Sequence, residues 1–343
     1  MKQVTKLHLN HVGTFRRHLL AASLGLAATA ALGQPSFAPQ SNYPDKPIRF
    51  VVGFAAGGSA DVVARAIALE LTKTLGQPVT VDNKPGAGAH IATQALLSAP
   101  ADGYTILFAG LTLATNPALL GNLGYNPDKD LVMVSQLTAI PVVVFVPAKS
   151  PINNMQDLIA ASKAKPEGLT FGSGGTGTSS HLGPELLSRT VGFKYTHVPY
   201  RGGAPALQGL LSGDTDAMFD IAVTPMHRAN VEAGKIKFIG VMQKDPISSY
   251  TSIKPAGQQG IPPAAFMRSW QGIAVKQGTS PAIVGKLHAS ISAALKNPEV
   301  INRLIASGAE VQGSKNPEEF QKLYQQELVR WTGLIKAAGI KAE

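Results

Sequence analysis

The sequence predicts an α/β fold of two domains, each a mostly parallel sheet flanked by helices. Three observations support this prediction. Short apolar runs of strand length alternate with segments in which apolar residues recur at helical spacing. A glycine-rich loop joins a strand to a helix at two places, about 120 residues apart. The chain has 343 residues, 44% of them hydrophobic, which is enough for two separate cores.

The first part of the chain alternates between strands and helices. We expect a strand at 48–52, the glycine loop 53–61, a helix running to residue 75, a strand at 78–81, a helix at 89–97 and a strand at 104–108. Strands that are joined through helices pair in parallel. Two further β-rich runs, 131–137 and 142–146, are split by Pro141, and we interpret them as the crossing into a second domain.

The alternation then starts again. We expect helices at 155–163, 180–191, 205–211 and 226–233, strands at 169–171, 195–198, 217–219 and 236–242, and a loop at 244–265. A return strand at 270–275 and helices at 281–296 and 317–338 complete the chain. The predicted first domain is therefore discontinuous, comprising 43–141 and 268–343, and the second domain, 142–267, is inserted into it.

The N-terminus has the features of an export signal. Four basic residues precede an apolar stretch at 19–32, and Ser36-Phe37-Ala38 offers small residues at signal-peptidase spacing. We expect residues 1–38 to be a signal peptide that is removed after Ala38. The apolar stretch is shorter than the roughly 20 residues of an ordinary membrane-spanning helix. Arg16-Arg17 leaves both the general secretory route and the twin-arginine route open.

Composition excludes several classes of function. The chain has no cysteine, which rules out disulfides, thiolate metal sites and cysteine catalysis. Four of the 31 basic residues lie in the leader, leaving 27 against 21 acidic residues, a net charge of +6. Aromatics are 6% and do not alternate with basic clusters, so no nucleic-acid partner is expected. Neither metal-binding histidine spacing nor a nucleotide-binding glycine motif occurs, and we expect no cofactor.

The two glycine loops are the predicted ligand site. Each loop opens a helix, where unpaired backbone N–H groups and the positive end of the helix dipole attract an anion. The carboxyl ends of strands are also where open α/β sheets bind ligands. Candidate residues of the first loop are Phe54, Ala55, Gly57, Gly58 and Ser59; those of the second are Gly175, Thr176, Gly177, Thr178, Ser179, Ser180 and His181; four others follow strands, namely Thr112, Thr115, Arg201 and Asp220.

These residues also have structural interpretations. The glycines could simply form tight turns, the hydroxyls could cap helices, His181 could pack in a core, and Arg201 could be a solvated loop charge. Arg201 could equally clamp a carboxylate through two hydrogen bonds. Asp61 is expected to be a first-turn residue favoured by the helix dipole, because its carboxylate would compete with an anionic ligand.

Over residues 43–339 the chain resembles the Bug (TctC) family of periplasmic receptors of tripartite tricarboxylate transporters. The resemblance is carried by the order and spacing of many short motifs: Tyr43-Pro44-Asp45-Lys46-Pro47-Ile48, Gly57-Gly58-Ser59-Ala60-Asp61, Val81-Asp82-Asn83-Lys84-Pro85-Gly86-Ala87-Gly88, Ala101-Asp102-Gly103-Tyr104, Asn116-Pro117, Tyr125-Asn126-Pro127, Gly175-Thr176-Gly177-Thr178, Ser180-His181-Leu182, Pro199-Tyr200-Arg201-Gly202, Ala204-Pro205-Ala206-Leu207, Met218-Phe219-Asp220 and the strand at Trp270.

The resemblance implies a two-domain, type II-like periplasmic binding protein that closes as a venus flytrap. Such a protein would be a monomer, would hold a small di- or tricarboxylate or aromatic carboxylate in the two loops, and would offer it to membrane permease subunits. Three positions depart from the family pattern: Ala55, Ile221 and Gln259. Ile221 removes a polar group beside Asp220, which favours an apolar or aromatic carboxylate over an amino acid.

Two other functions are compatible with parts of the sequence. A sensor that presents its ligand to a membrane histidine kinase would use the same site. A secreted hydrolase would need Ser59 or Ser180 as nucleophile with His181 as base, but adjacent residues at a helix start rarely align for proton transfer. We therefore expect a binding protein rather than an enzyme.

Overall fold

The computed structural model describes residues 42–341, apart from positions 58, 201, 222 and 248–249. The expected signal peptide, Gly58 and Arg201 therefore lie outside the described residues. The chain divides into two compact units, Met1–Tyr43 and Pro44–Glu343, and every described helix and strand belongs to the second.

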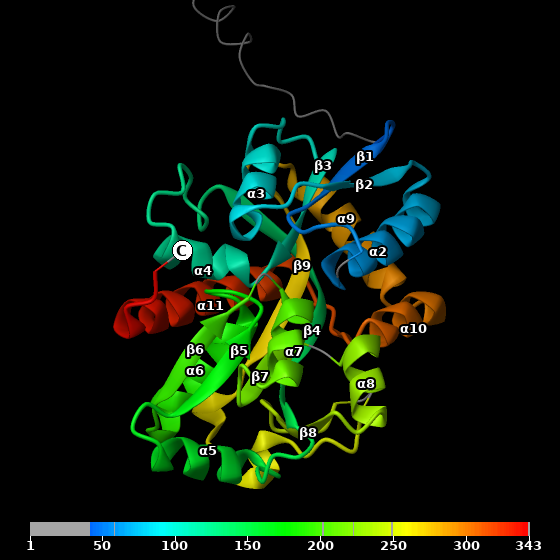
Figure 1. Ribbon diagram of the computed structural model, residues 1–343. Coiled ribbons are helices and arrows are strands. Elements are labelled where there is room, and N and C mark those ends of the chain that lie inside the picture. The colour runs from blue at the N-terminus through cyan, green and yellow to red at the C-terminus, as the bar shows by residue number, and fades with distance from the viewer. Residues whose placement is uncertain (1–41, 58, 201, 222, 248–249, 342–343) are drawn as a thin grey trace, which may run out of the picture. The chain divides into compact units, whose positions relative to one another are not determined.

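One ten-stranded sheet runs through the second unit (Figure 1). Its order is β2-β1-β3-β9-β4-β7-β5-β6, and β8 and β10 also pair with β4. The strands are β1 (Ile48–Val52), β2 (Val79–Asn83), β3 (Thr105–Gly110), β4 (Leu131–Pro147), β5 (Leu169–Ser173), β6 (Tyr195–Pro199), β7 (Ala217–Ile221), β8 (Ile236–Val241), β9 (Arg268–Lys276) and β10 (Glu310–Val311).

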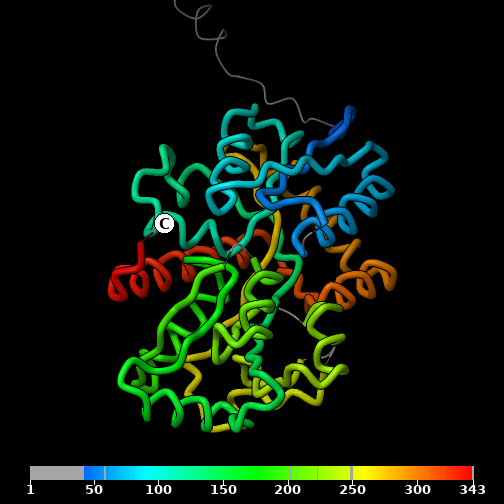
Figure 2. The backbone as a smooth tube through the Cα atoms, viewed as in Figure 1, coloured from blue at the N-terminus to red at the C-terminus, as the bar shows by residue number. Residues whose placement is uncertain are grey.

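Helices flank the sheet on both sides, and the tube view shows the same winding of the chain (Figures 1 and 2). The α-helices are α2 (Ser59–Leu75), α3 (His90–Leu97), α4 (Thr112–Leu119), α5 (Met155–Ala164), α6 (Ser179–Val191), α7 (Gly203–Ser212), α8 (Pro225–Glu232), α9 (Pro281–Ala294), α10 (Pro298–Ala306) and α11 (Pro317–Ala338). Short 3₁₀ turns lie at Ala87–Ala89, Ala256–Gln259 and Pro263–Ala265, the last two within the expected loop 244–265.

The sheet has two halves with the same local order. In the first half β1 pairs in parallel with β2 and β3, and in the second β5 pairs in parallel with β6 and β7. Between them β9 and β4 run antiparallel to each other and to their outer neighbours, β3 and β7. The predicted α/β class is confirmed, and the sheet is more mixed than expected because this antiparallel pair lies at its centre.

The expected division of residues 131–146 into two strands is wrong. β4 is one strand of 17 residues that continues through Pro141. Pro141 stands opposite Arg268, the first residue of β9, and the next residue already pairs with β7. A proline cannot donate to a strand ladder. It is tolerated here because β4 changes partners at this point. The expected domain boundary at 141/142 thus falls inside a continuous strand.

Three elements were not predicted: α4, α10 and β10. α4 is short and contains Pro117, which interrupts the helical pattern. α10 did have a start signal, since the side chain of Asn297 caps it by accepting from Glu299 N–H and Pro298 opens it.

The C-terminal helix α11 completes the core of the first half. Phe320, Tyr324 and Trp331 on this helix are fully buried. The rings of Phe320 and Tyr324 form T-shaped contacts with Trp270 in β9, their centroids lying 5.5 Å and 6.2 Å from that of the Trp270 ring. Large aromatic side chains contribute most of the buried apolar area in such a core. Trp270 is thereby held in place on β9, which pairs with β3 of the first half and with β4.

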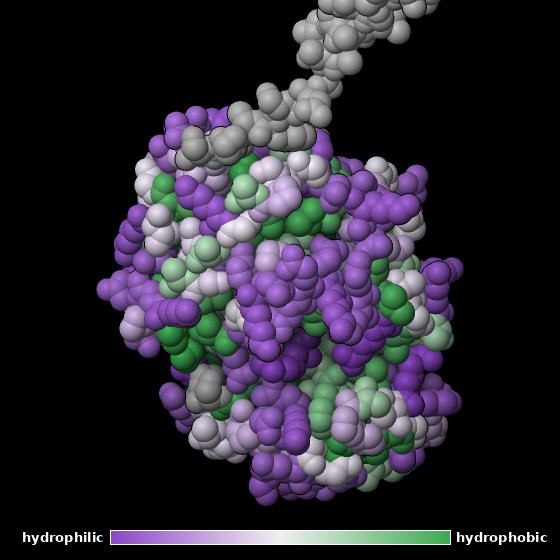
Figure 3. All heavy atoms as spheres, turned by 180° about the vertical axis from the view of Figure 1, so that it is seen from behind, coloured by the Kyte–Doolittle hydropathy of each residue, from purple (hydrophilic) through white to green (hydrophobic). Residues whose placement is uncertain are grey.

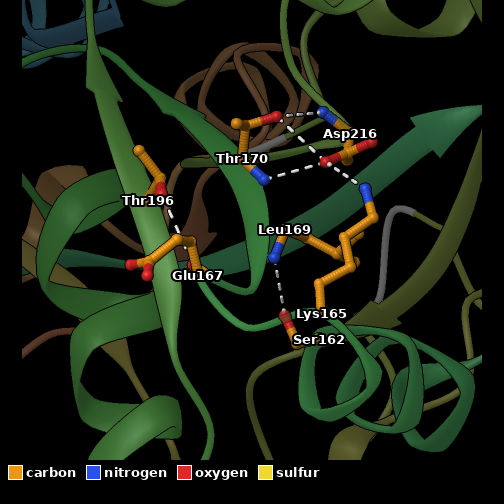
Figure 4. A network of polar contacts seen from close by, with 7 residues as sticks. All are labelled: Ser162, Lys165, Glu167, Leu169, Thr170, Thr196 and Asp216. Carbon is orange, nitrogen blue, oxygen red and sulfur yellow. Dashed lines mark hydrogen bonds and ion pairs between the residues drawn. The ribbon is translucent and has the colours of Figure 1, made fainter.

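A polar network aligns β5 with β7 at their amino ends (Figure 4). The carboxylate of Asp216 accepts from the backbone N–H of Thr170 at 2.9 Å and from its hydroxyl at 3.0 Å, while Lys165 approaches the same oxygen at 3.4 Å. Ser162 in α5 accepts from Leu169 N–H at 3.3 Å. The network fixes the register of two strands whose opposite ends carry the second glycine loop and Asp220.

The surface seen from behind is predominantly hydrophilic across its middle, and apolar residues show there only in small separate patches (Figure 3). No helix in the described part of the chain combines the length and apolar character that a membrane crossing requires.

Close packing of β9 against α11 gives a test of the fold. A Cβ added at Gly272 would lie 2.3 Å from Phe320 Cζ and 2.6 Å from the carbonyl oxygen of Ser135, whereas one added at Gly285 in α9 would meet nothing within 4 Å. We expect Gly272→Ala to lower the free energy of unfolding by about 1–3 kcal/mol. The control Gly285→Ala should raise it by up to about 1 kcal/mol. Urea unfolding measures both, and equal effects would contradict this packing.

Candidate functional site

A cavity of about 440 Å³ lies between the two halves of the sheet. The first half contributes the loop after β1, the end of β3 and the start of β9; the second contributes the loop after β5 and the starts of α7 and α8. The lining residues are Phe54, Ala55, Ser59, Ala60, Phe108, Gly110, Leu111, Thr112, Gly174, Gly177, Thr178, Ser179, Ser180, Gly202, Gly203, Ala204, Asp220, Ile221, Thr224, Met226, His227, Ser269, Trp270 and Gln271.

Five helices begin at this cavity. The first residues of α2, α4, α6 and α7 line it, as does Thr224, the N-cap of α8. The first four N–H groups of a helix have no intrahelical acceptor, and the helix dipole places a partial positive charge there. The cavity therefore has a positive field without a cationic side chain, since its described lining includes no lysine or arginine.

The body of the cavity is apolar. Phe54, Phe108, Ile221, Met226 and Trp270 form much of its wall. Such a wall suits a ligand with a hydrocarbon body, and a few polar groups then orient it.

Asp61, in the first turn of α2, holds the first loop in place through hydrogen bonds. Its carboxylate accepts from Gly57 N–H at 2.9 Å, from Arg65 Nε at 2.8 Å and from Asn83 Nδ2 at 2.9 Å. Asn83 also donates to the carbonyl of Phe54 at 3.0 Å. The hydrogen bond from Arg65 is the main cause that lowers the pKa of Asp61 to about 2; burial opposes this shift, and the hydrogen bonds from Gly57 and Asn83 add to it.

The second loop is braced by its own side chains. The N–H groups of Gly174, Gly175 and Gly177 donate to Ser180 Oγ at 2.9 Å, Ser173 Oγ at 3.1 Å and His181 Nδ1 at 3.1 Å. These three glycine donors are therefore engaged within the loop, contrary to the expectation that the loop would offer them to an anion. Gly174, Gly177 and Thr178 of this loop still line the cavity, together with Ser179 and Ser180 in the first turn of α6.

His181 packs inside the second half rather than in the cavity. Its ring stacks on that of His197, with centroids 3.7 Å apart and planes at 2°. Burial, aided by the neighbouring His197, lowers the pKa of His181 to about 3. The ring stays neutral at pH 7, and its Nδ1 can accept from Gly177. His181 is accordingly a brace of the loop.

Four buried polar atoms in the cavity wall have no hydrogen-bond partner in the described part of the chain. They are Ser59 Oγ, Thr112 Oγ1, Trp270 Nε1 and His227 Nε2. Buried polar groups in proteins are almost always paired, and leaving one unpaired costs about 1–3 kcal/mol. Four of them on one cavity indicate a site that is completed by a polar ligand.

Asp220 and His227 are the titratable side chains in the described lining. Asp220 Oδ2 lies 3.4 Å from His227 Nε2, and Asp220 Oδ1 accepts from Ile221 N–H at 2.8 Å. Burial raises the pKa of Asp220 to about 7, partly offset by that hydrogen bond, and burial lowers the pKa of His227 to about 4. The imidazole is thus neutral at pH 7, and the carboxyl carries less charge than an exposed aspartate.

The structure brings most of the predicted residues to the cavity. Those that line it are Phe54, Ala55, Ser59, Thr112, Gly177, Thr178, Ser179, Ser180 and Asp220. Gly57, Thr115, Gly175, Thr176 and His181 are placed outside the lining. Sequence reasoning did not select Trp270 or His227. His227 follows a Thr-Pro pair typical of a helix start, and Trp270 lies on a predicted strand, but neither signal indicates a ligand.

The chain matches a known family over most of its length. A model described as "Tripartite tricarboxylate transporter family receptor", TctC, matches residues 63–340. The chain belongs to this family. The relative "UPF0065 protein in gbd 5'region" of Cupriavidus necator is 37% identical over 286 residues, covering 82% of this chain and 86% of the relative.

Solved structures of the same type carry carboxylates. The structure titled "R. palustris Rpa4515 with adipate" has a TM-score of 0.77 and 29% identity, covering 88% of this chain and all of that one. "MatC (Rpa3494) from Rhodopseudomonas palustris with bound malate" has a TM-score of 0.72 and 32% identity, covering 85% of this chain and all of that one. This TctC protein is a periplasmic solute-binding receptor and not an enzyme, as expected.

The Asp61 contacts give a test with a defined pH dependence. The pKa of Asp61 is lowered from 3.8 to about 2, so its ionised form stabilises the folded protein above pH 4, and this contribution is lost as the pH falls through about 2. We expect Asp61→Asn to lower the free energy of unfolding at pH 7 by on the order of 1–2 kcal/mol, allowing for the exposure of Arg65. The deficit should shrink between pH 4 and pH 2 in urea titrations. A deficit of the same size at pH 2 would exclude this role.

Proposed function

We propose that this protein captures a small carboxylate with an apolar or aromatic body in the cavity and delivers it to the membrane permease of a tripartite tricarboxylate transporter. The observation that carries the proposal is the convergence of five helix N-termini on one apolar cavity that has no basic side chain in its described lining. Membership of the TctC family and the malate and adipate of its relatives support the class of ligand.

The carboxylate would bind where α2, α4 and α6 begin. Ser59 Oγ and Thr112 Oγ1, both unpartnered, are the hydroxyls that would donate to it, together with backbone N–H groups of the first turns. A helix dipole contributes roughly 0.3–2 kcal/mol, while micromolar affinity requires about 8 kcal/mol. Hydrogen bonds to the charged group and burial of the apolar body must therefore supply much of the affinity.

Export and closure complete the proposal. Residues 1–38 would direct the chain to the periplasm and be removed there. The domains 43–141 with 268–343, and 142–267, would then close over the ligand, since the lining comes from both halves of the sheet. Closure would present the loaded form to the permease.

A thermal-shift screen of residues 39–343 tests this function. Mono-, di- and aromatic carboxylates are compared with their matched amides. A ligand at 100 times its dissociation constant adds about 2.7 kcal/mol of stability. We expect at least one carboxylate to raise the melting temperature while its amide does not, because an amide carries no charge for the helix dipoles. Equal shifts, or no shift after refolding to remove carried-over ligand, would exclude carboxylate capture.

Two threonines of α4 provide a matched pair of variants for that screen. Thr112 lines the cavity and its Oγ1 has no hydrogen-bond partner in the described chain, whereas Thr115 lies outside the lining and its hydroxyl donates to the Thr112 carbonyl at 3.5 Å. Thr112→Val should weaken binding of the carboxylate by about tenfold or more, because a hydrogen bond to a charged group is lost. The stability of the unliganded protein should not fall. Thr115→Val should leave affinity unchanged. Equal affinities in the two variants would remove Thr112 from the site.

A further inference from the structure

The cavity has a second polar centre, formed by His227 of α8 and Asp220 of β7. Neither residue belongs to the two glycine loops. His227 is completely buried, and its Nε2 lacks a hydrogen-bond partner in the described chain although it faces Asp220 Oδ2 at 3.4 Å. That separation is too long for a good hydrogen bond. His227 Nε2 is therefore a buried polar atom without a hydrogen-bond partner in the described chain, directed at the carboxylate of Asp220.

The hydrogen of His227 is placed by the cap of α8. Nδ1 accepts from the backbone N–H of Thr224 at 3.3 Å and lies 2.9 Å from the Thr224 hydroxyl, which can also donate to it. A neutral imidazole that accepts at Nδ1 carries its hydrogen on Nε2. The burial that lowers the pKa of His227 keeps the ring neutral. His227 thus directs one N–H donor toward Asp220, and both residues belong to the cavity lining.

Packing holds both side chains in position. The His227 ring stacks on Phe145 of β4 with centroids 4.5 Å apart and planes at 22°. Asp220 Oδ2 lies directly against the first residue of α7, because a Cβ on Gly203 would stand 2.5 Å from it. Neither group can turn away easily, so the donor and the acceptor form a preorganised pair.

We propose that His227 Nε2–H and Asp220 Oδ2 bind a hydroxyl group on the ligand, remote from its carboxylate, and so set the specificity of the receptor. A hydroxyl accepts one hydrogen bond and donates another, which matches a donor beside an acceptor. It also suits either protonation state of Asp220, whose pKa is near 7, whereas a second carboxylate would be repelled by the ionised form. This inference rests on the proposed carboxylate site.

Two series of probes of different length test it by isothermal titration: benzoate, 4-hydroxybenzoate and terephthalate; and hexanoate, 6-hydroxyhexanoate and adipate. In at least one series the hydroxy acid should bind more tightly than its parent acid, benzoate or hexanoate, by a factor of about ten or more. Only the hydroxy acid offers a hydrogen-bond partner to both buried groups. His227→Phe keeps an aromatic ring that can stack on Phe145 and should abolish this advantage, because it removes the N–H donor.

Asn230→Ala is the control on the same helix, because the Asn230 side chain donates to the Met226 carbonyl at 2.9 Å and the residue does not line the cavity. Nitrogen NMR of the histidine rings gives a readout on the unaltered protein: the His227 Nε2–H resonance should shift with the hydroxy acid and not with the parent.

Three results would overturn the inference. One is a hydroxy acid that binds no more tightly than its parent in both series. Another is a hydroxyl advantage that survives in His227→Phe, together with a His227 Nε2–H resonance that does not shift when the hydroxy acid binds to the unaltered protein. The third is that terephthalate or adipate binds most tightly and that its affinity falls as the pH rises. This result would mean that protonated Asp220 binds a second carboxylate. If none of the six acids binds, the proposed carboxylate site itself fails.

Discussion

The antiparallel pairing of β4 with β9 is the constraint on which the rest of the structure depends. β4 passes without a break from pairing with β9 to pairing with β7 and β8, and so it joins two parallel sets of strands into one sheet. Each set delivers its strand ends, and the helices that follow them, to the same cavity. Trp270 on β9 lines that cavity and is anchored from behind by α11. The site is thus a consequence of how the two halves are joined.

The chemistry of the site follows from this arrangement. The positive field comes from helix termini, and the described lining supplies no lysine or arginine, so recognition of the proposed carboxylate would depend on backbone dipoles in an apolar setting. The charged groups near the loops serve other purposes. Asp61, with Arg65 and Asn83, holds the first loop, and the neutral ring of His181 holds the second.

Local patterns predicted the two strand–loop–helix units well, because both the apolar spacing and the glycines lie within one stretch of sequence. The engagement of the loop N–H groups by Asp61, Ser180 and His181 was not foreseen, since it depends on side-chain positions in the folded loop. β4 was divided at Pro141 because partner exchange along a strand leaves no mark in a single sequence. His227 was missed for a similar reason: only the folded cap of α8 directs its Nε2 toward Asp220.

A crystal structure with 6-bromohexanoate tests the central claim most directly, because the anomalous signal of bromine fixes the direction of the ligand. The account predicts carboxylate oxygens about 2.7–3.1 Å from N–H and hydroxyl donors where α2, α4 and α6 begin, near Ser59, Thr112 and Ser180, with bromine in the apolar part of the cavity. A carboxylate bound to a lysine or arginine side chain away from these helix starts, or a ligand bound outside the cavity, would contradict it.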